Sequence, residues 1–373
     1  MFDKVFFKNI KTILTGTVLD KILLIISMPL ITRLYDPENF ALFALFSSVV
    51  SIFCSLTCLQ VEHLIVITKE ENNISEILTS AFYAGLIVSF FAYVTLEFCY
   101  YFKLKSVLEL NNYIFTLFLT IFFSNTVHIF AQYFVRYSQF QKFNYIKIIN
   151  TITFITFTIT GYFLDLSLNS LIIGYTLGFI FSNLYGIYFV PLTFFNIKPK
   201  KFITYIKKNK DLTLYGSLGN FVRNLQSEIP IILISYYFTS LLLSFYALVT
   251  KILLLPISIL ARTVGTANYK HITKLIFANK PIFKHLFKLT ISLFAFTIIP
   301  VICCFLFSEI FIKLVFGNNW SYSAKILQIL SIGYAFKFVS LALLETAYPL
   351  KIVKSVSILN YFSTFVEIRH CLE

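Results

Sequence analysis

The chain has 373 residues, of which 58% are hydrophobic and 13% charged, and its mean hydropathy is +0.81. A water-soluble fold needs more polar surface than this composition supplies. A membrane-spanning helix takes about 20 apolar residues, so the chain has room for about ten or eleven spans and for no folded domain outside the membrane. The composition therefore excludes a soluble enzyme and predicts an all-α, polytopic transmembrane helix bundle.

Apolar blocks bounded by charged or turn residues follow one another along the chain. In order, they cover residues 12–33, 40–61, 77–101, 111–134, 144–164, 169–194, 212–238, 241–263, 286–307 and 323–347. A weaker block begins near Ile352 and is interrupted by Glu367 and Arg369. The blocks predict ten spans and the beginning of an eleventh.

Lysine and arginine residues are distributed unequally over the connections between these blocks. If the N-terminus is cytoplasmic, one set of alternate connections carries 21 of these residues and the opposite set carries 5. Connections rich in Lys and Arg stay in the cytoplasm. We therefore expect a multi-pass protein with a cytoplasmic N-terminus, and the net charge of +14 needs no nucleic-acid partner to explain it.

The middle of the chain predicts a division into two pseudo-symmetric lobes. The basic stretch 198–211 contains six lysines and is either an interfacial helix or a solvated linker. It separates a six-span lobe, residues 1–197, from residues 212–373, an incomplete lobe of four or five spans. Residues 28–31 (Met-Pro-Leu-Ile) resemble residues 229–232 (Ile-Pro-Ile-Ile), with the two prolines 201 positions apart. Six spans lie between them, so the repeats would have the same orientation in the membrane.

Four cationic residues fall inside the predicted spans, namely Lys21, Arg223, Lys251 and Lys337. A charge at the centre of a spanning helix costs about 2.5 to 3.5 kcal/mol, so each should face a cavity or a partner. Asn220 and Asn224 lie on the same helical face as Arg223. We expect these six residues to line a substrate lumen, although structural ion pairs are an equally good explanation for any one charge.

Acidic residues and prolines within the spans suggest how such a lumen would work. Asp20, Glu97 and Glu228 are candidates for coupling to an ion. Asp20 and Lys21 are adjacent and point about 100° apart on a helix, so we do not expect them to pair. Pro29 and Pro230 interrupt helical hydrogen bonding and are candidate hinges. The sequence has no catalytic triad, phosphate loop or Cys/His cluster with metal-ligand spacing, so we expect no enzyme activity, metal or cofactor.

Several stretches together resemble a known family. They are residues 14–17 (Leu-Thr-Gly-Thr), residues 29–40 (Pro-Leu-Ile-Thr-Arg-Leu-Tyr-Asp-Pro-Glu-Asn-Phe), residues 44–46 (Ala-Leu-Phe) and residues 316–320 (Phe-Gly-Asn-Asn-Trp). The chain resembles the bacterial O-antigen and capsule polysaccharide flippases of the multidrug/oligosaccharidyl-lipid/polysaccharide exporter superfamily. It departs from them at Ala41, where glycine is usual, and by ending within its eleventh span, as a truncated copy would.

The resemblance implies a function and its partners. Such proteins move undecaprenyl-pyrophosphate-linked oligosaccharides across the inner membrane by alternating access. Their partners are the lipid-linked oligosaccharide, membrane lipids and other polysaccharide-assembly proteins. Arg33 would act at the exit or in a structural contact with Asp36 or Glu38. The alternatives are a small-molecule exporter of the same superfamily, a membrane glycan polymerase, and a non-functional truncated copy.

The charge distribution makes a topology prediction. Reporter fusions after Lys147, Lys208 and Lys280 should read cytoplasmic, and fusions near Lys105 and Asn318 should read periplasmic, because the basic connections remain inside. Paired alkaline phosphatase and fluorescent-protein fusions measure this directly. A periplasmic signal after Lys208 would contradict the two-lobe arrangement.

Overall fold

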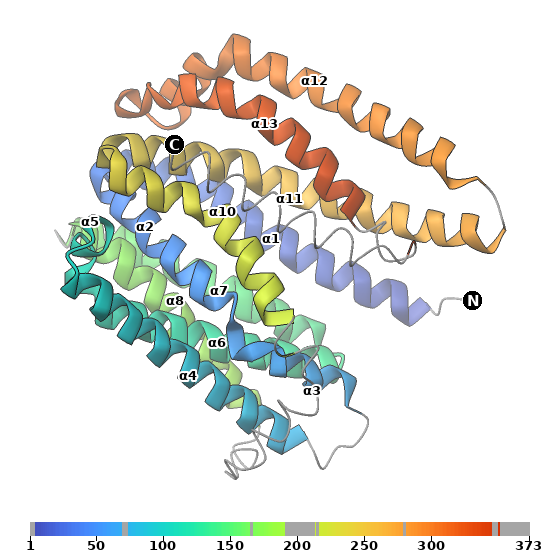
Figure 1. The fold of residues 1–373 in the computed structure, drawn as a ribbon, viewed down its shortest axis with the longest axis horizontal. Helices are drawn as coiled ribbons and strands as arrows, with labels where there is room; N and C mark the ends of the chain where they lie inside the picture. The colour runs from blue at the N-terminus through green and yellow to red at the C-terminus, as the bar shows by residue number, and fades with distance from the viewer. Residues whose placement is uncertain are drawn as a thin grey trace. The chain divides into compact units, whose positions relative to one another are not determined.

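The computed structural model describes residues 4–68, 74–164, 167–190, 213, 216–278, 281–344 and 350 (Figure 1). This part of the chain folds into helices joined by short turns. The helices are α1 (Lys4–Leu34), α2 (Pro37–Cys54), η1 (Thr57–His63), α3 (Leu64–Ile67), α4 (Ile74–Tyr101), α5 (Lys105–Leu108), η3 (Asn111–Tyr113), α6 (Ile114–Arg136), α7 (Phe140–Phe163), α8 (Ser167–Phe189), α10 (Ser217–Tyr237), α11 (Ser240–Phe277), α12 (Ile282–Val315), η6 (Asn318–Trp320) and α13 (Ser323–Leu344).

The helices confirm the predicted all-α membrane bundle. Among the described residues, eight are long and apolar enough to cross a membrane: α2, α4, α6, α7, α8, α11, α12 and α13. Helices α1 and α10 have 31 and 21 residues, which is also enough to span, but they carry the polar residues that the sequence analysis identified. The predicted eleventh block and the stretch 198–211 lie outside the described residues.

Among the predicted helix ends that differ from the structure are those of α2 and α11. Helix α2 stops at Cys54 instead of continuing to residue 61, because Cys58, Leu59 and Gln60 have φ angles of 46°, 50° and 60°, which no α-helix allows. Helix α11 runs on to Phe277, well beyond the predicted residue 263. Apolarity sets the limits of a block, whereas backbone conformation and helix propensity set the limits of a helix.

The chain forms two compact units. Unit 1 contains residues 1–27 and 42–239, and unit 2 contains residues 28–41 and 240–373. The chain therefore passes from unit 1 to unit 2 inside α1, between Ser27 and Met28, and returns inside α2. The six-span and four-to-five-span lobes defined by the sequence repeat stay a prediction.

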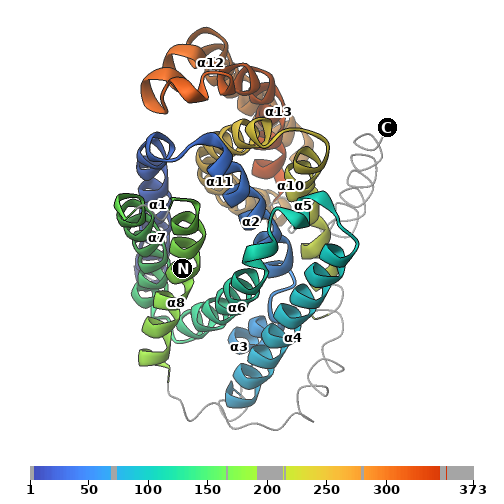
Figure 2. The same ribbon diagram turned by 90° about the vertical axis from the view of Figure 1, so that its left-hand side faces the viewer.

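Unit 1 is built on packed helix pairs, among them α7 with α8, α4 with α6, and α6 with α8 (Figure 2). Close approach of α7 and α8 depends on Gly178: a Cβ atom there would lie 2.8 Å from the carbonyl oxygen of Asn150. Small residues allow helix backbones to pack tightly in a membrane, where lipid is as apolar as the side chains. The α7–α8 pair is thus held by backbone-level contact.

Helix α10 belongs to unit 1 as well, although the sequence repeat assigns it to the second lobe. Its C-terminal turn is fixed to α5 by two hydrogen bonds. The hydroxyl of Ser235 lies 2.8 Å from the hydroxyl of Ser106, and Lys105 Nζ donates to the carbonyl oxygen of Tyr236 at 3.2 Å. These contacts satisfy a helix end that has no further intrahelical partners.

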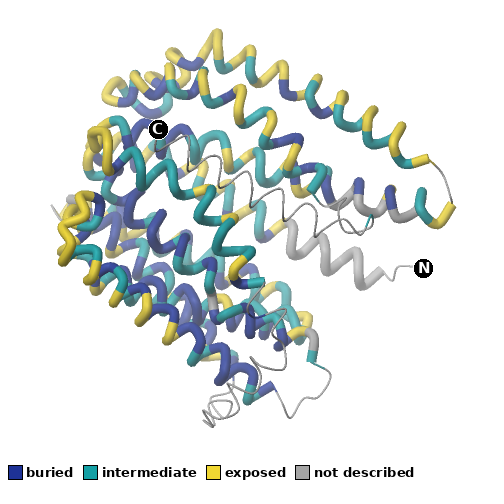
Figure 3. Tube along the Cα trace, viewed as in Figure 1, coloured by how far each residue is buried: buried dark blue, intermediate teal, exposed yellow. Residues whose placement is uncertain are grey.

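In unit 2, α13 packs against both α11 and α12. Helix α12 presents much of its length to the surroundings, as the exposed positions along its tube show (Figure 3). The outward side chains are apolar, with Ile299, Leu306 and Leu314 each about two-thirds or more exposed. Such a surface suits contact with lipid acyl chains.

A buried tryptophan joins the ends of three segments of unit 2. Trp320 is fully buried, and its Nε1 donates a 2.8 Å hydrogen bond to the carbonyl oxygen of Thr32 in the last turn of α1. Its ring packs edge-on against Phe40 of α2 and Phe245 of α11, with centroid distances of 5.3 and 6.0 Å. Gly317 makes the preceding turn possible, because its φ of 103° is unfavourable for other residues.

We expect Trp320→Phe to lower the stability of the protein by about 1 to 3 kcal/mol, because the Thr32 carbonyl would stay buried without its donor. Thermal unfolding of the detergent-purified protein measures the change. Phe307→Leu is the matched control, since Phe307 lies exposed on α12. Equal unfolding temperatures for Trp320→Phe and the wild type would show that this hydrogen bond contributes nothing.

Candidate functional site: charged residues within the helices

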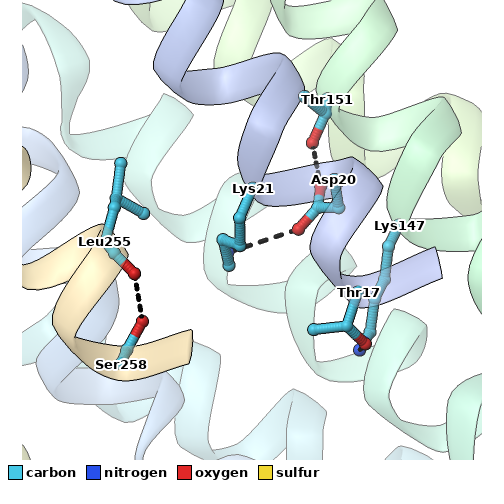
Figure 4. A network of polar contacts seen from close by, with 7 residues as sticks. All are labelled: Thr17, Asp20, Lys21, Lys147, Thr151, Leu255 and Ser258. Carbon is cyan, nitrogen blue, oxygen red and sulfur yellow. Dashed lines mark hydrogen bonds and ion pairs between the residues drawn. The ribbon is translucent and has the colours of Figure 1, made fainter. Parts of the chain in front are cut away.

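The polar face of α1 packs on α7 inside unit 1 (Figure 4). Thr151 on α7 donates its hydroxyl to the carboxylate of Asp20, and Lys147 Nζ lies 3.4 Å from the hydroxyl of Thr17. The spacing of Thr17 and Asp20 on α1 matches that of Lys147 and Thr151 on α7, so each pair is one helical turn from the next. Thr17 and Asp20 thus take part in a helix–helix contact between α1 and α7.

Lys21 is paired with Asp20, contrary to the expectation from their positions on the helix. Its Nζ lies 3.3 Å from Asp20 Oδ2, as Figure 4 shows. The Cβ directions of adjacent residues diverge, but four methylene groups allow the lysine side chain to bend back to its neighbour. About a third of the Lys21 side chain stays exposed, whereas Asp20 is buried.

The polar stripe of α10 has a different environment. Arg223 is exposed, and its Nη2 donates a 3.1 Å hydrogen bond to Oδ1 of Asn220, one turn earlier. Asn224 and Glu228 are half-buried on the same helix, and the backbone carbonyl of Glu228 accepts a hydrogen bond from Ser48 at 3.5 Å. The guanidinium keeps its charge while bound to a neutral amide, so it can still attract an anion.

The cations of unit 2 both lie over aromatic rings. Lys251 Nζ is 5.1 Å from the ring centre of Phe40, and Lys337 Nζ is 5.2 Å from that of Tyr334. Both lysines are half-buried. A cation over a ring is attracted by the ring's quadrupole, which offsets part of the cost of its removal from water.

Arg33 caps the end of another helix. Its guanidinium donates to the carbonyl oxygens of Leu314 and Val315, the latter through Nε at 3.2 Å, at the C-terminus of α12. A cation at this position satisfies free carbonyls and complements the helix dipole. Asp36 and Glu38 are exposed at the start of α2.

Other predicted residues lie at separate places in the helices. Glu97 is exposed on α4, where it is hydrogen-bonded to the hydroxyl of Tyr93 one turn before it. Pro29 lies inside α1 and Pro230 inside α10. Pro29 directly follows the position at which α1 passes from unit 1 to unit 2.

The candidate lumen residues are divided between the units. Lys21, Asn220, Arg223 and Asn224 belong to unit 1, and Lys251 and Lys337 belong to unit 2. Within the described ranges, no three His, Cys, Asp or Glu side chains come together as ligands for a metal ion. Each unit therefore holds only part of the predicted set.

The predicted site omits one residue that the structure makes conspicuous. Glu62 lies in η1, between α2 and α4 and outside the eight spans; it is only 4% exposed, and its Oε2 has no hydrogen-bond partner. His63 Nε2 is 4.0 Å from the other carboxylate oxygen. Burial raises the pKa of Glu62 to about 8. The sequence feature that could have identified Glu62 is a carboxylate among apolar residues.

Arg136 closes the segment that follows Glu62. Its Nη1 donates to the carbonyl oxygens of Ile65 and Thr68, both at 2.6 Å, and so fixes the end of α3 against the end of α6. The three left-handed residues before Glu62 and the arginine clamp after it hold the carboxyl group in an apolar environment. Such strain is costly and persists only where the surrounding structure enforces it.

Solved structures of membrane transport proteins share this fold. The structure is similar to an inward-facing multidrug-resistance MATE-family transporter of the MOP superfamily, with a TM-score of 0.69 and 13% identity over 94% of this chain and 84% of that one. It is also similar to the lipid II flippase MurJ in an inward closed conformation, with a TM-score of 0.74 and 17% identity over 94% and 78%. A mutant of the MATE transporter VcmN of Vibrio cholerae matches with a TM-score of 0.54 and 10% identity over 96% and 85%. Identities this low show a shared fold.

The family follows from the sequence itself. Residues 30–325 match the family model described as polysaccharide biosynthesis protein. The chain therefore belongs to the polysaccharide biosynthesis protein family, and it has the fold of the flippases and exporters of the MOP superfamily. No curated protein matches the sequence. The resemblance noted in the sequence is confirmed at the level of the family.

Glu62 gives the stability of the protein a distinctive pH dependence. Its pKa is higher in the folded protein than the ordinary 4.5, so folding loses stability as pH rises from about 4.5 to about 8 and the buried carboxyl group ionises. Glu62→Gln should remove this loss, and the unfolding temperature of the variant should fall less over this pH range. The exposed Glu38→Gln is the control. Parallel curves for wild type and Glu62→Gln would contradict the assignment.

Proposed function

We propose that this protein is a flippase that moves undecaprenyl-pyrophosphate-linked oligosaccharides from the cytoplasmic to the periplasmic leaflet of the bacterial inner membrane. The transported units would serve O-antigen or capsule polysaccharide synthesis, together with other polysaccharide-assembly proteins. The observation that carries the proposal is the family match over residues 30–325. The similarity to the lipid II flippase MurJ supports it, since that protein is also a flippase of a lipid.

The substrate class explains why cations should lie inside apolar helices. A lipid-linked oligosaccharide carries a diphosphate at the membrane interface, a polar glycan that needs a wet path, and a polyprenyl tail that can stay in lipid. Four cations, Lys21, Arg223, Lys251 and Lys337, would offset the charge of the diphosphate as it crosses. Asn220 and Asn224 would supply neutral hydrogen-bonding groups for the phosphates or the sugars.

Arg223 is the strongest of these candidates. It is exposed on α10, keeps its charge beside the neutral Asn220, and can offer its remaining N–H groups to phosphate oxygens. Lys21 is the weakest candidate, because Asp20 already lies 3.3 Å from its Nζ. Lys251 and Lys337 are intermediate, since an aromatic ring lies beside each of them and offsets part of the cost of burying its charge.

Other predicted residues would couple transport to an ion or allow the helices to bend. Asp20, Glu97 and Glu228 are the candidates for binding the coupling ion, and Asp20 is the best placed because it is buried and bound to both Thr151 and Lys21. Pro29 and Pro230 are the proposed hinges of alternating access. The hinge role of Pro29 is supported by its position, because α1 passes from unit 1 to unit 2 between Ser27 and Met28.

A small-molecule exporter is the second candidate, favoured by the similarity to the MATE-family transporter. An exporter of cationic drugs would use acidic side chains in its lumen, whereas this chain places lysines and an arginine in its spans. Drug resistance without complementation of a flippase-deficient strain would favour the exporter.

Arg223 variants test the proposal. In complementation of a flippase-deficient strain, Arg223→Lys should retain most activity, Arg223→Gln should lose about 10- to 100-fold, and Arg223→Glu should lose all of it, because the charge attracts the diphosphate. Lys325→Gln is the matched control, as Lys325 is an exposed cation at the start of α13. Surface polysaccharide per cell and membrane abundance of each variant are the measurements.

A purely structural role for Arg223 predicts a different result for a double variant. If the arginine only balances Glu228, the double variant Arg223→Gln, Glu228→Gln should recover the activity that Arg223→Gln loses. Such a recovery, or full activity of Arg223→Gln alone, would contradict the proposed role. Failure of the double variant to recover supports it.

A further inference from the structure

Two histidines meet where α11 and α12 adjoin. His271 lies near the end of α11, beyond the spanning stretch that ends at Gly265, and His285 lies in the first turn of α12. Their ring centres are 4.3 Å apart and the ring planes are tilted by 40°. The pair lies outside the charged residues discussed above and has no part in the proposed transport function.

A buried asparagine orients one of the rings. Nε2 of His285 is 2.8 Å from Oδ1 of Asn268, which is only 5% exposed. An amide oxygen can only accept a hydrogen bond, so Nε2 carries the proton and Nδ1 presents a lone pair. Histidines that bind metals are held in this way, with the second ring nitrogen donating to an oxygen of the protein.

We propose that His271 and His285 bind a divalent transition-metal ion of the nitrogen-preferring class, such as Zn²⁺ or Cu²⁺, with water completing its coordination. Two imidazoles sharing a tetrahedral zinc ion, with zinc–nitrogen bonds of about 2.1 Å, have ring centres about 5 Å apart. The observed 4.3 Å needs only a small opening of the pair. Imidazole nitrogen suits Zn²⁺, Cu²⁺ and Ni²⁺, and oxygen-preferring ions such as Mg²⁺ and Ca²⁺ should not bind.

The local charge and the number of protein ligands limit the affinity for the metal ion. Lys284 and Lys288 are exposed on α12, and water and salt screen their repulsion of a cation. No third Cys, His, Asp or Glu joins the pair among the described residues, so the ion has two protein ligands. A bound ion would join the end of α11 to the beginning of α12, which stabilises the turn between them.

The test uses the full chain purified in detergent with an affinity tag that contains no histidine. Isothermal titration with Zn²⁺ should give one ion per chain, and Zn²⁺ should raise the unfolding temperature. With Cu²⁺, electron paramagnetic resonance should show coupling to two nitrogen atoms. His271→Ala and His285→Ala should each weaken binding at least tenfold, and Asn268→Leu should weaken it by about 10- to 100-fold.

His63→Ala is the matched control, because it removes a half-exposed imidazole elsewhere and should leave binding unchanged. His271 is exposed, so His271→Ala should fold, and the Cu²⁺ spectrum of the wild type needs no variant at all. Three results would overturn the proposal: no stoichiometric Zn²⁺ binding, the same affinity in His271→Ala, or binding of inorganic phosphate at this hairpin with no metal bound.

Discussion

Helix ends need hydrogen-bond partners, and in a chain this apolar few groups are available to supply them. At one corner of unit 2, two helix ends are satisfied by residues from the opposite end of the sequence. Trp320, which follows α12, donates to a carbonyl at the end of α1, and Arg33, at the end of α1, donates to the last carbonyls of α12. Two of the stretches that carry the family resemblance, residues 29–40 and 316–320, are therefore in contact. Each stretch supplies hydrogen-bond donors to the helix end that lies beside the other.

Polar side chains within the helices have the same need, and most meet it inside their own unit. Asp20 and Thr17 bind α7, and Asn125 donates to the carbonyl oxygen of Gly85 on α4. These contacts give each polar group a partner within unit 1. Others lie beside groups that carry no charge: Arg223 bonds a neutral amide, and Lys251 and Lys337 lie over aromatic rings. The part that these residues play in transport stays a prediction.

Hydropathy was enough to predict the helices, because lipid demands long apolar segments whatever their tertiary contacts. The early end of α2 could not be predicted, since the left-handed turn at Cys58, Leu59 and Gln60 has no glycine to indicate it. For the site, the sequence predicted which charges fall within helices but not their partners. The pairing of Lys21 with Asp20 depends on side-chain bending, and the burial of Glu62 depends on a turn with no sequence signal.

The tight seam between α7 and α8 has a consequence for how this protein is made. The two helices are joined by a short connection, and Gly178 brings their backbones into contact with no contribution from the rest of the chain. Association in lipid depends on such packing because the hydrophobic effect does not drive it. The hairpin can thus assemble as soon as both helices have left the ribosome and entered the bilayer. Helix α6, which precedes the hairpin in the chain and packs on both of its helices, can then dock on a preformed surface.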